Sequence, residues 1–168
     1  MSFVLSQGFP PVAALDAEIL ILGSMPGKKS LQAEEYYAHP QNVFWDIMNE
    51  LIQAGRHLTY LQRLQILQKN HIALWDVAFQ CEREGSLDAK IRMQSVRVND
   101  FKTFFLHHSK IRHIFFNGQK AEQLFHQRVR SEIENFSISM KRLPSTSPAH
   151  AHLSRAEKIK EWRSILRK

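Results

Sequence analysis

A short segment rich in aromatic and amide side chains precedes a predicted helix. It reads Tyr36-Tyr37-Ala38-His39-Pro40-Gln41-Asn42-Val43-Phe44-Trp45. An aromatic ring can stack on a planar ligand, and an asparagine amide offers both a hydrogen-bond donor and an acceptor. Two simpler interpretations stay open, because Asn42 lies where a helix N-cap would and the two tyrosines could be ordinary surface aromatics.

A second candidate segment is the turn Gly23-Ser24-Met25-Pro26-Gly27, which follows an apolar run. Two glycines and a proline favour a tight turn whose backbone N–H groups can bind an anion or a carbonyl oxygen. The turn is not a Walker loop, since Lys28 is followed by Lys29 rather than by Ser or Thr, and it does not match the dinucleotide fingerprint. An ordinary strand-to-loop turn is an equally good interpretation.

The elements that must position these segments alternate between strands and helices. Continuous apolar runs, typical of strands buried on both faces, occupy residues 18–22, 71–75, 111–116 and, more weakly, 136–140. Apolar residues at helical spacing predict helices over residues 43–54, 60–67, 99–105, 118–128 and 154–166. We expect Gly55 to cap the first of these helices and a capping box from Ser154 to Glu157 to begin the last.

This alternation predicts the α/β class, because strands joined through helices form crossover units and parallel sheets. We expect a single three-layer α/β/α domain over residues 1–168, with a central, mostly parallel four-stranded sheet. In such folds ligands bind beyond the carboxyl ends of the strands. That rule selects the segments 23–42, 75–88, 117–120 and 144–152, which can converge on one cleft.

The positive charge of the chain lies mainly at its end. The formal net charge is +7, and residues 141–168 hold eight basic residues against two acidic ones, which is +6 of that total. A basic block favours a polyanion such as nucleic acid. A solvated basic helix is an equally good interpretation on charge alone.

Composition excludes several other classes of protein. The single cysteine, Cys81, cannot form an internal disulfide and is expected to be a buried apolar residue. No apolar run approaches the length of a membrane span, and the first residues lack the basic region of a signal peptide, so we expect a cytoplasmic protein. The nine histidines show no spacing typical of a metal site, and we expect no metal and no cofactor.

Four segments together resemble a known family. The turn at 23–27 with Ser30 and the segment 36–45 resembles motif one of the uracil-DNA glycosylase superfamily, specifically its hypoxanthine-DNA (deoxyinosine) glycosylase branch. Three further segments agree in order and spacing, and the likeness spans roughly residues 8 to 165. They are Leu74-Trp75-Asp76-Val77 with Cys81, Arg83 and 85–88; Phe116-Asn117-Gly118-Gln119-Lys120-Ala121; and Ser145-Thr146-Ser147-Pro148-Ala149.

The resemblance implies an enzyme that flips a damaged base out of DNA and hydrolyses its N-glycosidic bond. Tyr37 would stack against the base, backbone groups of Gly23, Ser24 and Met25 would bind its edge, and Asn117 would read its lactam group. The loop of Ser145, Thr146, Ser147, Pro148 and Ala149 would enter the minor groove, and Arg142 would contact phosphates. His150 stands where many relatives carry Asn, so this chain departs from the family pattern at that position.

One departure from the superfamily pattern locates the catalytic group. Most branches hold a water-positioning Asn or Asp inside the glycine-proline turn, where this chain has Met25. In the hypoxanthine branch the catalytic asparagine lies downstream, and that role carries over to Asn42, which would orient the attacking water. A combined glycosylase/lyase needs an amine nucleophile, and only the exposed-looking Lys28 and Lys29 lie nearby, so monofunctional hydrolysis is expected.

The expected partner is DNA that contains a deaminated base, with hypoxanthine first and uracil second, bound by a monomer at the nucleoid of a prokaryote. A non-catalytic nucleic-acid-binding domain that keeps the glycosylase fold is the alternative, because Met25 occupies the usual catalytic position. A hydrolase of free nucleosides is a third hypothesis. Asp76 and Asp88 could both face the cleft, but Asp88, which follows Gly85 and Ser86, fits a turn or cap residue better.

Overall fold

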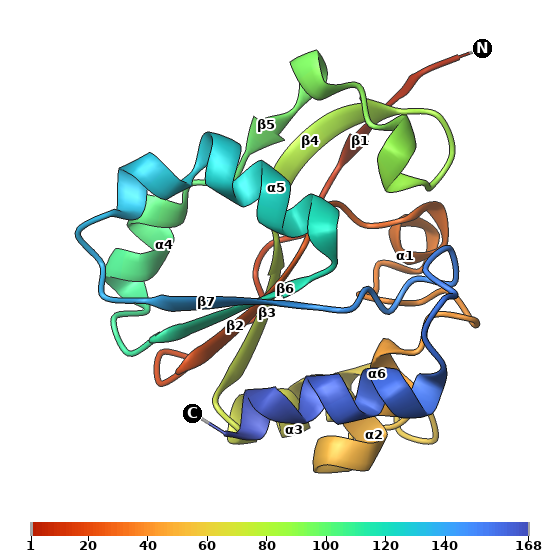
Figure 1. Cartoon of the computed structure of the whole chain (residues 1–168), viewed down its shortest axis with the longest axis vertical. Helices are drawn as coiled ribbons and strands as arrows, with labels where there is room; N and C mark the ends of the chain where they lie inside the picture. The colour runs from red at the N-terminus through yellow and green to blue at the C-terminus, as the bar shows by residue number, and fades with distance from the viewer. Residues whose placement is uncertain (1, 168) are drawn as a thin grey trace.

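A four-stranded, wholly parallel sheet forms the centre of the protein (Figure 1). The computed structural model describes residues 2–167. The strand order is β3-β2-β6-β7, and the strands are β2 (Ile19–Gly23), β3 (Ile72–Asp76), β6 (His113–Asn117) and β7 (Ser139–Leu143). All three pairings between neighbours are parallel. The predicted α/β class and its four-stranded sheet are confirmed, although β7 begins three residues later than predicted.

Helices cover both faces of this sheet because its strands are apolar on both sides. Leu20 and Leu22 of β2 pack against α4 (Phe101–His107) and α5 (Gln119–Arg128) on one face. Ile19 and Ile21 belong to the core of the other face. The helices of that face are α2 (Phe44–Ile52), α3 (Tyr60–Lys69) and α6 (Arg155–Trp162). The three-layer prediction is therefore confirmed.

A second, antiparallel sheet was not predicted. It joins β1 (Val4–Gln7), β4 (Ala78–Arg83) and β5 (Arg97–Val98) in the order β1-β4-β5. β1 and β5 are short and mostly exposed, so they lack the apolar signal of a buried strand. The short helix α1 (Lys28–Ala33) was also missed, since only Ser30 of its residues is buried.

Helix ends show one confirmed and one wrong prediction. The capping box between Ser154 and Glu157 is present at the start of α6. The prediction that Gly55 caps α2 is wrong, because Gln53 at φ +62° holds the C-cap position. Gly55 is instead a point of close approach, where a Cβ would lie 2.4 Å from Oδ1 of Asn49. The predicted helix at 154–166 ends at Trp162 and continues as the 3-10 turn η4 (Arg163–Leu166).

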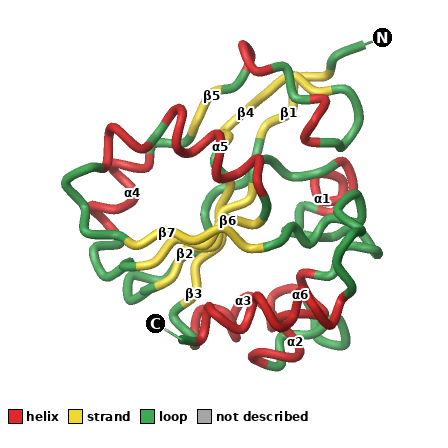
Figure 2. The backbone as a smooth tube through the Cα atoms, viewed as in Figure 1, coloured by secondary structure: helices red, strands yellow, loops and turns green. Residues whose placement is uncertain are grey.

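The remaining short turns are η1 (Asp88–Lys90), η2 (Met93–Ser95) and η3 (Arg130–Ile133). Loops gather at the carboxyl edge of the parallel sheet, where the chain after β7 runs beside the loops that flank α1 (Figure 2). Among residues 2–167, every helix is too short or too polar to cross a membrane.

Candidate functional site

Hydrogen bonds through Thr146 join three of the predicted segments. The backbone N–H of Val43, next to Asn42, donates to the Thr146 carbonyl at 3.1 Å. The Asn117 side chain, at the end of β6, accepts from the Thr146 N–H at 2.9 Å and donates to its hydroxyl at 3.0 Å. The segments at Val43 and Asn117, about 75 residues apart, and the loop about 30 residues after Asn117 therefore meet at Thr146. Thr146 is almost fully buried (1% exposed).

A glycine allows this junction to close. Gly118 follows Asn117 with φ +93°, a left-handed conformation that favours glycine. A Cβ at this position would lie 3.0 Å from the Cβ of Ser145. The loop after β7 thus packs directly against the turn after β6, and any larger residue at 118 would push them apart.

Asn42 lies half-buried at the start of α2. Its Oδ1 atom accepts from the Phe44 N–H at 3.0 Å, which caps the helix start although Val43 holds the formal N-cap position. Asn42 therefore does cap the start of the helix, which was one of the interpretations open from the sequence. The Nδ2 group has no protein acceptor among residues 2–167, so the amide keeps a donor for a ligand or water.

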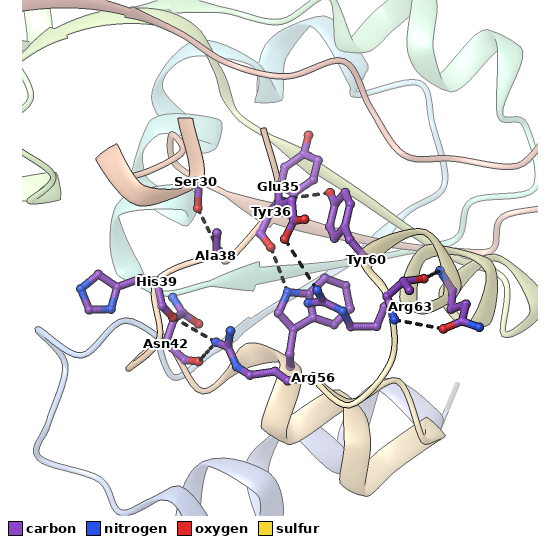
Figure 3. Close-up of polar contacts among 12 residues, drawn as sticks. Ser30, Glu35, Tyr36, Ala38, His39, Asn42, Arg56, Tyr60 and Arg63 are labelled. Carbon is purple, nitrogen blue, oxygen red and sulfur yellow. Dashed lines mark hydrogen bonds and ion pairs between the residues drawn. The ribbon is translucent and has the colours of Figure 1, made fainter. Parts of the chain in front are cut away.

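The segment that carries Asn42 is held by side chains from three helices and one loop (Figure 3). One nitrogen of Arg56 donates to the carbonyls of His39 at 3.0 Å and Asn42 at 2.8 Å. Ser30 accepts from the Ala38 N–H, while the Tyr60 hydroxyl and the Trp45 indole bind the backbone of Tyr36. These bonds fix the segment that carries Tyr37 and Asn42, although the segment itself is neither helix nor strand.

The two adjacent tyrosines have different environments. Tyr36 is a core residue at 3% exposure, its hydroxyl bonded to the Pro10 carbonyl, and it is not a surface aromatic. Tyr37, at φ +56°, stacks on Phe44 with centroids 4.0 Å apart and is half-buried. Its hydroxyl is buried, and among residues 2–167 it has no partner within strict hydrogen-bond geometry. Burial, followed by the charge of Asp76, raises its pKa, and a looser hydrogen bond with the Asn117 side chain opposes that shift.

The turn after β2 is buried from Gly23 to Pro26. Its carbonyls at Gly23 and Ser24 accept from Val77 and Ala78, and Met25 packs into the apolar core. Within residues 2–167 the backbone N–H groups of Ser24 and Met25 have no protein acceptor. These two N–H groups therefore keep free donors, whereas the Met25 side chain faces the core.

Two carboxyl groups lie next to this turn. Asp76 ends β3 beside Gly23 and is 4% exposed, and burial, then the charge of Asp88, raises its pKa to about 7. Asp88 accepts from the Ser24 hydroxyl at 2.6 Å. The residue is partly exposed, but the protein around its carboxyl excludes water, and this desolvation raises its pKa. Asp76 thus lies beside the candidate turn, at one of the positions that the sequence left open for it. Asp88 begins η1 and also bonds to the turn, a role that sequence reasoning missed because residue 88 is 64 positions from residue 24.

The predicted DNA-binding loop exposes its tip. Pro148 and Ala149 are exposed, Ser145 and Ser147 are half-buried, and Thr146 is buried in the junction described above. Arg142 is exposed and lies 3.9 Å from the carboxylate of Glu122. The loop thus offers small side chains at its tip and hydroxyls at its flanks.

The basic segment at 141–168 continues behind this loop. Arg155, Lys160 and Arg163 are exposed on or after α6, while Lys158 is buried and donates from Nζ to the His150 carbonyl at 2.6 Å. Burial lowers the pKa of Lys158. Lys168 lies outside the described residues. A hollow of about 190 Å³ separates the loop from α6 and from Gln41, and its lining includes Thr146, Ser147, His150, Arg155 and Lys158.

A larger hollow, of about 530 Å³, is lined by Tyr36 and by residues such as Phe9, Leu31 and Leu64. Neither Tyr37 nor Asn117 lines either hollow. Across residues 2–167 no three His, Cys, Asp or Glu side chains are grouped so that they could hold a metal ion.

The fold and site together define an α/β/α protein whose candidate functional groups gather at the carboxyl edge of a parallel sheet. The family model described as "Uracil DNA glycosylase superfamily" matches residues 10–167, and the chain belongs to this superfamily.

Proteins from two Methanosarcina species are similar to this chain. A "Hypoxanthine DNA glycosylase" of Methanosarcina acetivorans is 34% identical over 165 residues, which are 98% of this chain and 99% of that protein. A protein of the same name from Methanosarcina barkeri is 40% identical over 116 residues, 68% of this chain and 72% of its own length. The solution NMR structure of a Methanosarcina acetivorans protein, described provisionally as a uracil DNA glycosylase, superposes with a TM-score of 0.81 at 34% identity and covers 98% of both chains.

Proposed function

We propose that this chain is a monofunctional DNA glycosylase that hydrolyses the N-glycosidic bond of deaminated bases in DNA, with hypoxanthine as its preferred base. The observation that carries the proposal is the junction at Thr146, which brings the Asn42 segment, Asn117 and the loop at 145–149 into contact. The names of the Methanosarcina relatives support the same reaction and the same base. Uracil is proposed as a secondary substrate.

In this proposal Tyr37 and the turn at 23–27 hold the flipped base. The ring of Tyr37 is already fixed on one face by Phe44, so its other face is a pre-ordered stacking surface. The N–H groups of Ser24 and Met25 would donate to a carbonyl oxygen of the base. Hydrogen bonds of this kind also stabilise the negative charge that develops as the base departs.

Asn42 is proposed as the catalytic residue, and Asn117 as a residue that positions and reads the base. An amide cannot act as a strong base, so Asn42 would orient the water that attacks C1′ of the sugar. Both polar atoms of the Asn117 amide bind Thr146, but each can form one more hydrogen bond. One of these would reach the lactam edge of hypoxanthine or uracil.

The loop of Ser145, Thr146, Ser147, Pro148 and Ala149 is proposed as the wedge that enters the minor groove. Its exposed tip, at Pro148 and Ala149, is free to contact DNA, and Ser145, Ser147 and Arg142 would contact the flanking phosphates. The exposed basic residues of α6 extend the same surface. We propose that a monomer of 168 residues, folded as one domain, acts at the nucleoid in the cytoplasm.

The proposal is tested with labelled duplexes that contain one deoxyinosine or one deoxyuridine. We expect release of hypoxanthine, abasic sites that are cleaved only after alkali, and at least a hundredfold slower reaction of Asn42→Ala. Binding that weakens steeply with salt, without release of either base, would favour the non-catalytic alternative. Release of base from free inosine alone would favour a nucleoside hydrolase.

A further inference from the structure

The carboxyl end of β3 holds a buried acid that this mechanism does not use. Asp76 is the last residue of β3 and pairs with Gly23 in the parallel register. It is 4% exposed, and its Oδ2 atom has no hydrogen-bond partner among residues 2–167. A buried polar atom without a partner is unfavourable in a folded protein. Such a group is typical of a functional site, where the ligand completes its hydrogen bonds.

The position of Asp76 directs it toward the proposed base. A Cβ at Gly23 would lie 2.4 Å from Oδ1 of Asp76 and 3.4 Å from the Tyr37 hydroxyl. The missing side chain at residue 23 therefore lets these two groups approach the same point. A base stacked on the Tyr37 ring presents one edge to the hydroxyl end of that ring, which is where the Asp76 carboxyl lies.

The charged surroundings of Asp76 favour its neutral form. The ionisable groups around it are Asp88, Arg83, Tyr36, Tyr37 and Tyr60. Burial is the main cause of its raised pKa, the charge of Asp88 adds to the shift, and Arg83 opposes it. Arg83 is itself buried and bonds through Nη2 to the Pro26 carbonyl. One cation thus faces two carboxyl groups, an arrangement that favours the neutral form of one of them.

We propose that Asp76 is the general acid that protonates the departing purine, an inference that rests on the proposed glycosylase function. As the bond between C1′ and N9 breaks, its electron pair passes to the purine and the Asp76 proton passes to N7. Hypoxanthine then leaves as a neutral molecule. The attacking water adds its hydroxyl to C1′ and releases its second proton to solvent, from which the Asp76 carboxylate is protonated again.

The experiment measures single-turnover release of hypoxanthine from a deoxyinosine duplex between pH 5.5 and 8.5. We expect the wild-type rate to fall about tenfold per pH unit above the pKa of the acid, and Asp76→Asn to be at least about a hundredfold slower at pH 6 without that alkaline fall. Asp88→Asn removes the neighbouring charge and shifts the fall to lower pH. Asp16→Asn, which changes an exposed carboxylate elsewhere, keeps the wild-type profile.

A second substrate tests the atom that receives the proton. A duplex with 7-deaza-2′-deoxyinosine lacks N7, so wild type slows on it to the level of Asp76→Asn, and Asp76→Asn slows no further. Wild-type rates in Asp76→Asn at pH 6, an unshifted profile in Asp88→Asn, or full wild-type activity on the 7-deaza duplex would each overturn the inference. Failure of the wild type to release hypoxanthine at any pH would instead contradict the proposed function.

Discussion

The side-chain amide of Asn117 and the residue Thr146 are joined by two hydrogen bonds of 2.9 and 3.0 Å, across 29 positions of sequence. One bond runs from the Thr146 backbone to the amide oxygen, and the other from the amide nitrogen to the Thr146 hydroxyl. The candidate base-reading residue and the candidate DNA-binding loop are therefore one unit. A change at either residue alters the position of the other.

We expect Thr146→Val to destabilise the fold by about 1 to 3 kcal/mol, because the Asn117 amide loses its acceptor in a buried place. Thr146→Ser keeps the hydroxyl and stays close to wild type. Urea denaturation of both variants measures the difference. Equal stability of the two would mean that the side-chain bond contributes nothing.

Gly118→Ala is expected to cost about 1 to 3 kcal/mol, since it combines strained backbone with a contact 3.0 Å from the Ser145 Cβ. Gly85→Ala is the matched control, with φ +68° and no atom within 4 Å of the added Cβ. Only Gly118→Ala should also weaken binding to DNA, because it displaces the loop. Thermal unfolding and a DNA-binding titration separate the two effects; identical losses in both variants would refute the packing argument.

Substitutions at Asn42 separate its cap from its proposed catalytic role. Asn42→Ala removes the acceptor for the Phe44 N–H and should cost about 1 kcal/mol of stability. Asn42→Ser keeps a capping oxygen and recovers most of that stability, yet it cannot place the amide donor. We expect both variants to lose glycosylase activity about equally. Recovery of activity along with stability in Asn42→Ser would reduce Asn42 to a structural cap.

Arg56 is expected to position the Asn42 segment, since one of its nitrogens bonds to the His39 and Asn42 carbonyls. Arg56→Ala should lower kcat about ten- to a hundredfold by displacing the segment, with little change in KM. Arg56→Lys, which can bond to one carbonyl, should recover part of kcat. A loss confined to KM would indicate a DNA contact instead.

The pH dependence of stability tests the state of Asp76 without any activity assay. Its pKa is raised from 3.8 to about 7 in the folded protein, so the folded state holds a proton that the unfolded chain releases. The stabilising contribution is full below pH 3.8 and is lost as the pH rises through about 7. Over that interval the loss is on the order of 4 kcal/mol.

Asp76→Asn cannot titrate, so it should match wild type near pH 4 and exceed it in stability at pH 8. Denaturation midpoints at both pH values provide the comparison. A constant difference between wild type and Asp76→Asn across this range would show that the carboxyl is ionised throughout.

Local sequence determined the layers of this protein. The apolar runs at 18–22, 71–75 and 111–116 become β2, β3 and β6, because strands covered on both faces need apolar residues at every position. The capping box at Ser154 was readable for a similar reason, since both of its hydrogen bonds are formed within four residues. The second sheet was not readable, because its short exposed strands pair only with distant residues.

The site required the tertiary structure. The sequence alone singled out Asn42, Tyr37 and Asn117 through a resemblance and through residue chemistry, but it could not show which of them touch. Thr146 joins Asn117 to Val43, the neighbour of Asn42, and Asp76 and Asp88 meet the turn at Gly23 and Ser24, through contacts that span 29 to 103 positions. Parallel strands place their carboxyl ends at one edge whatever their order in the chain, and only packing at that edge decides which side chains share a proton or a hydrogen bond.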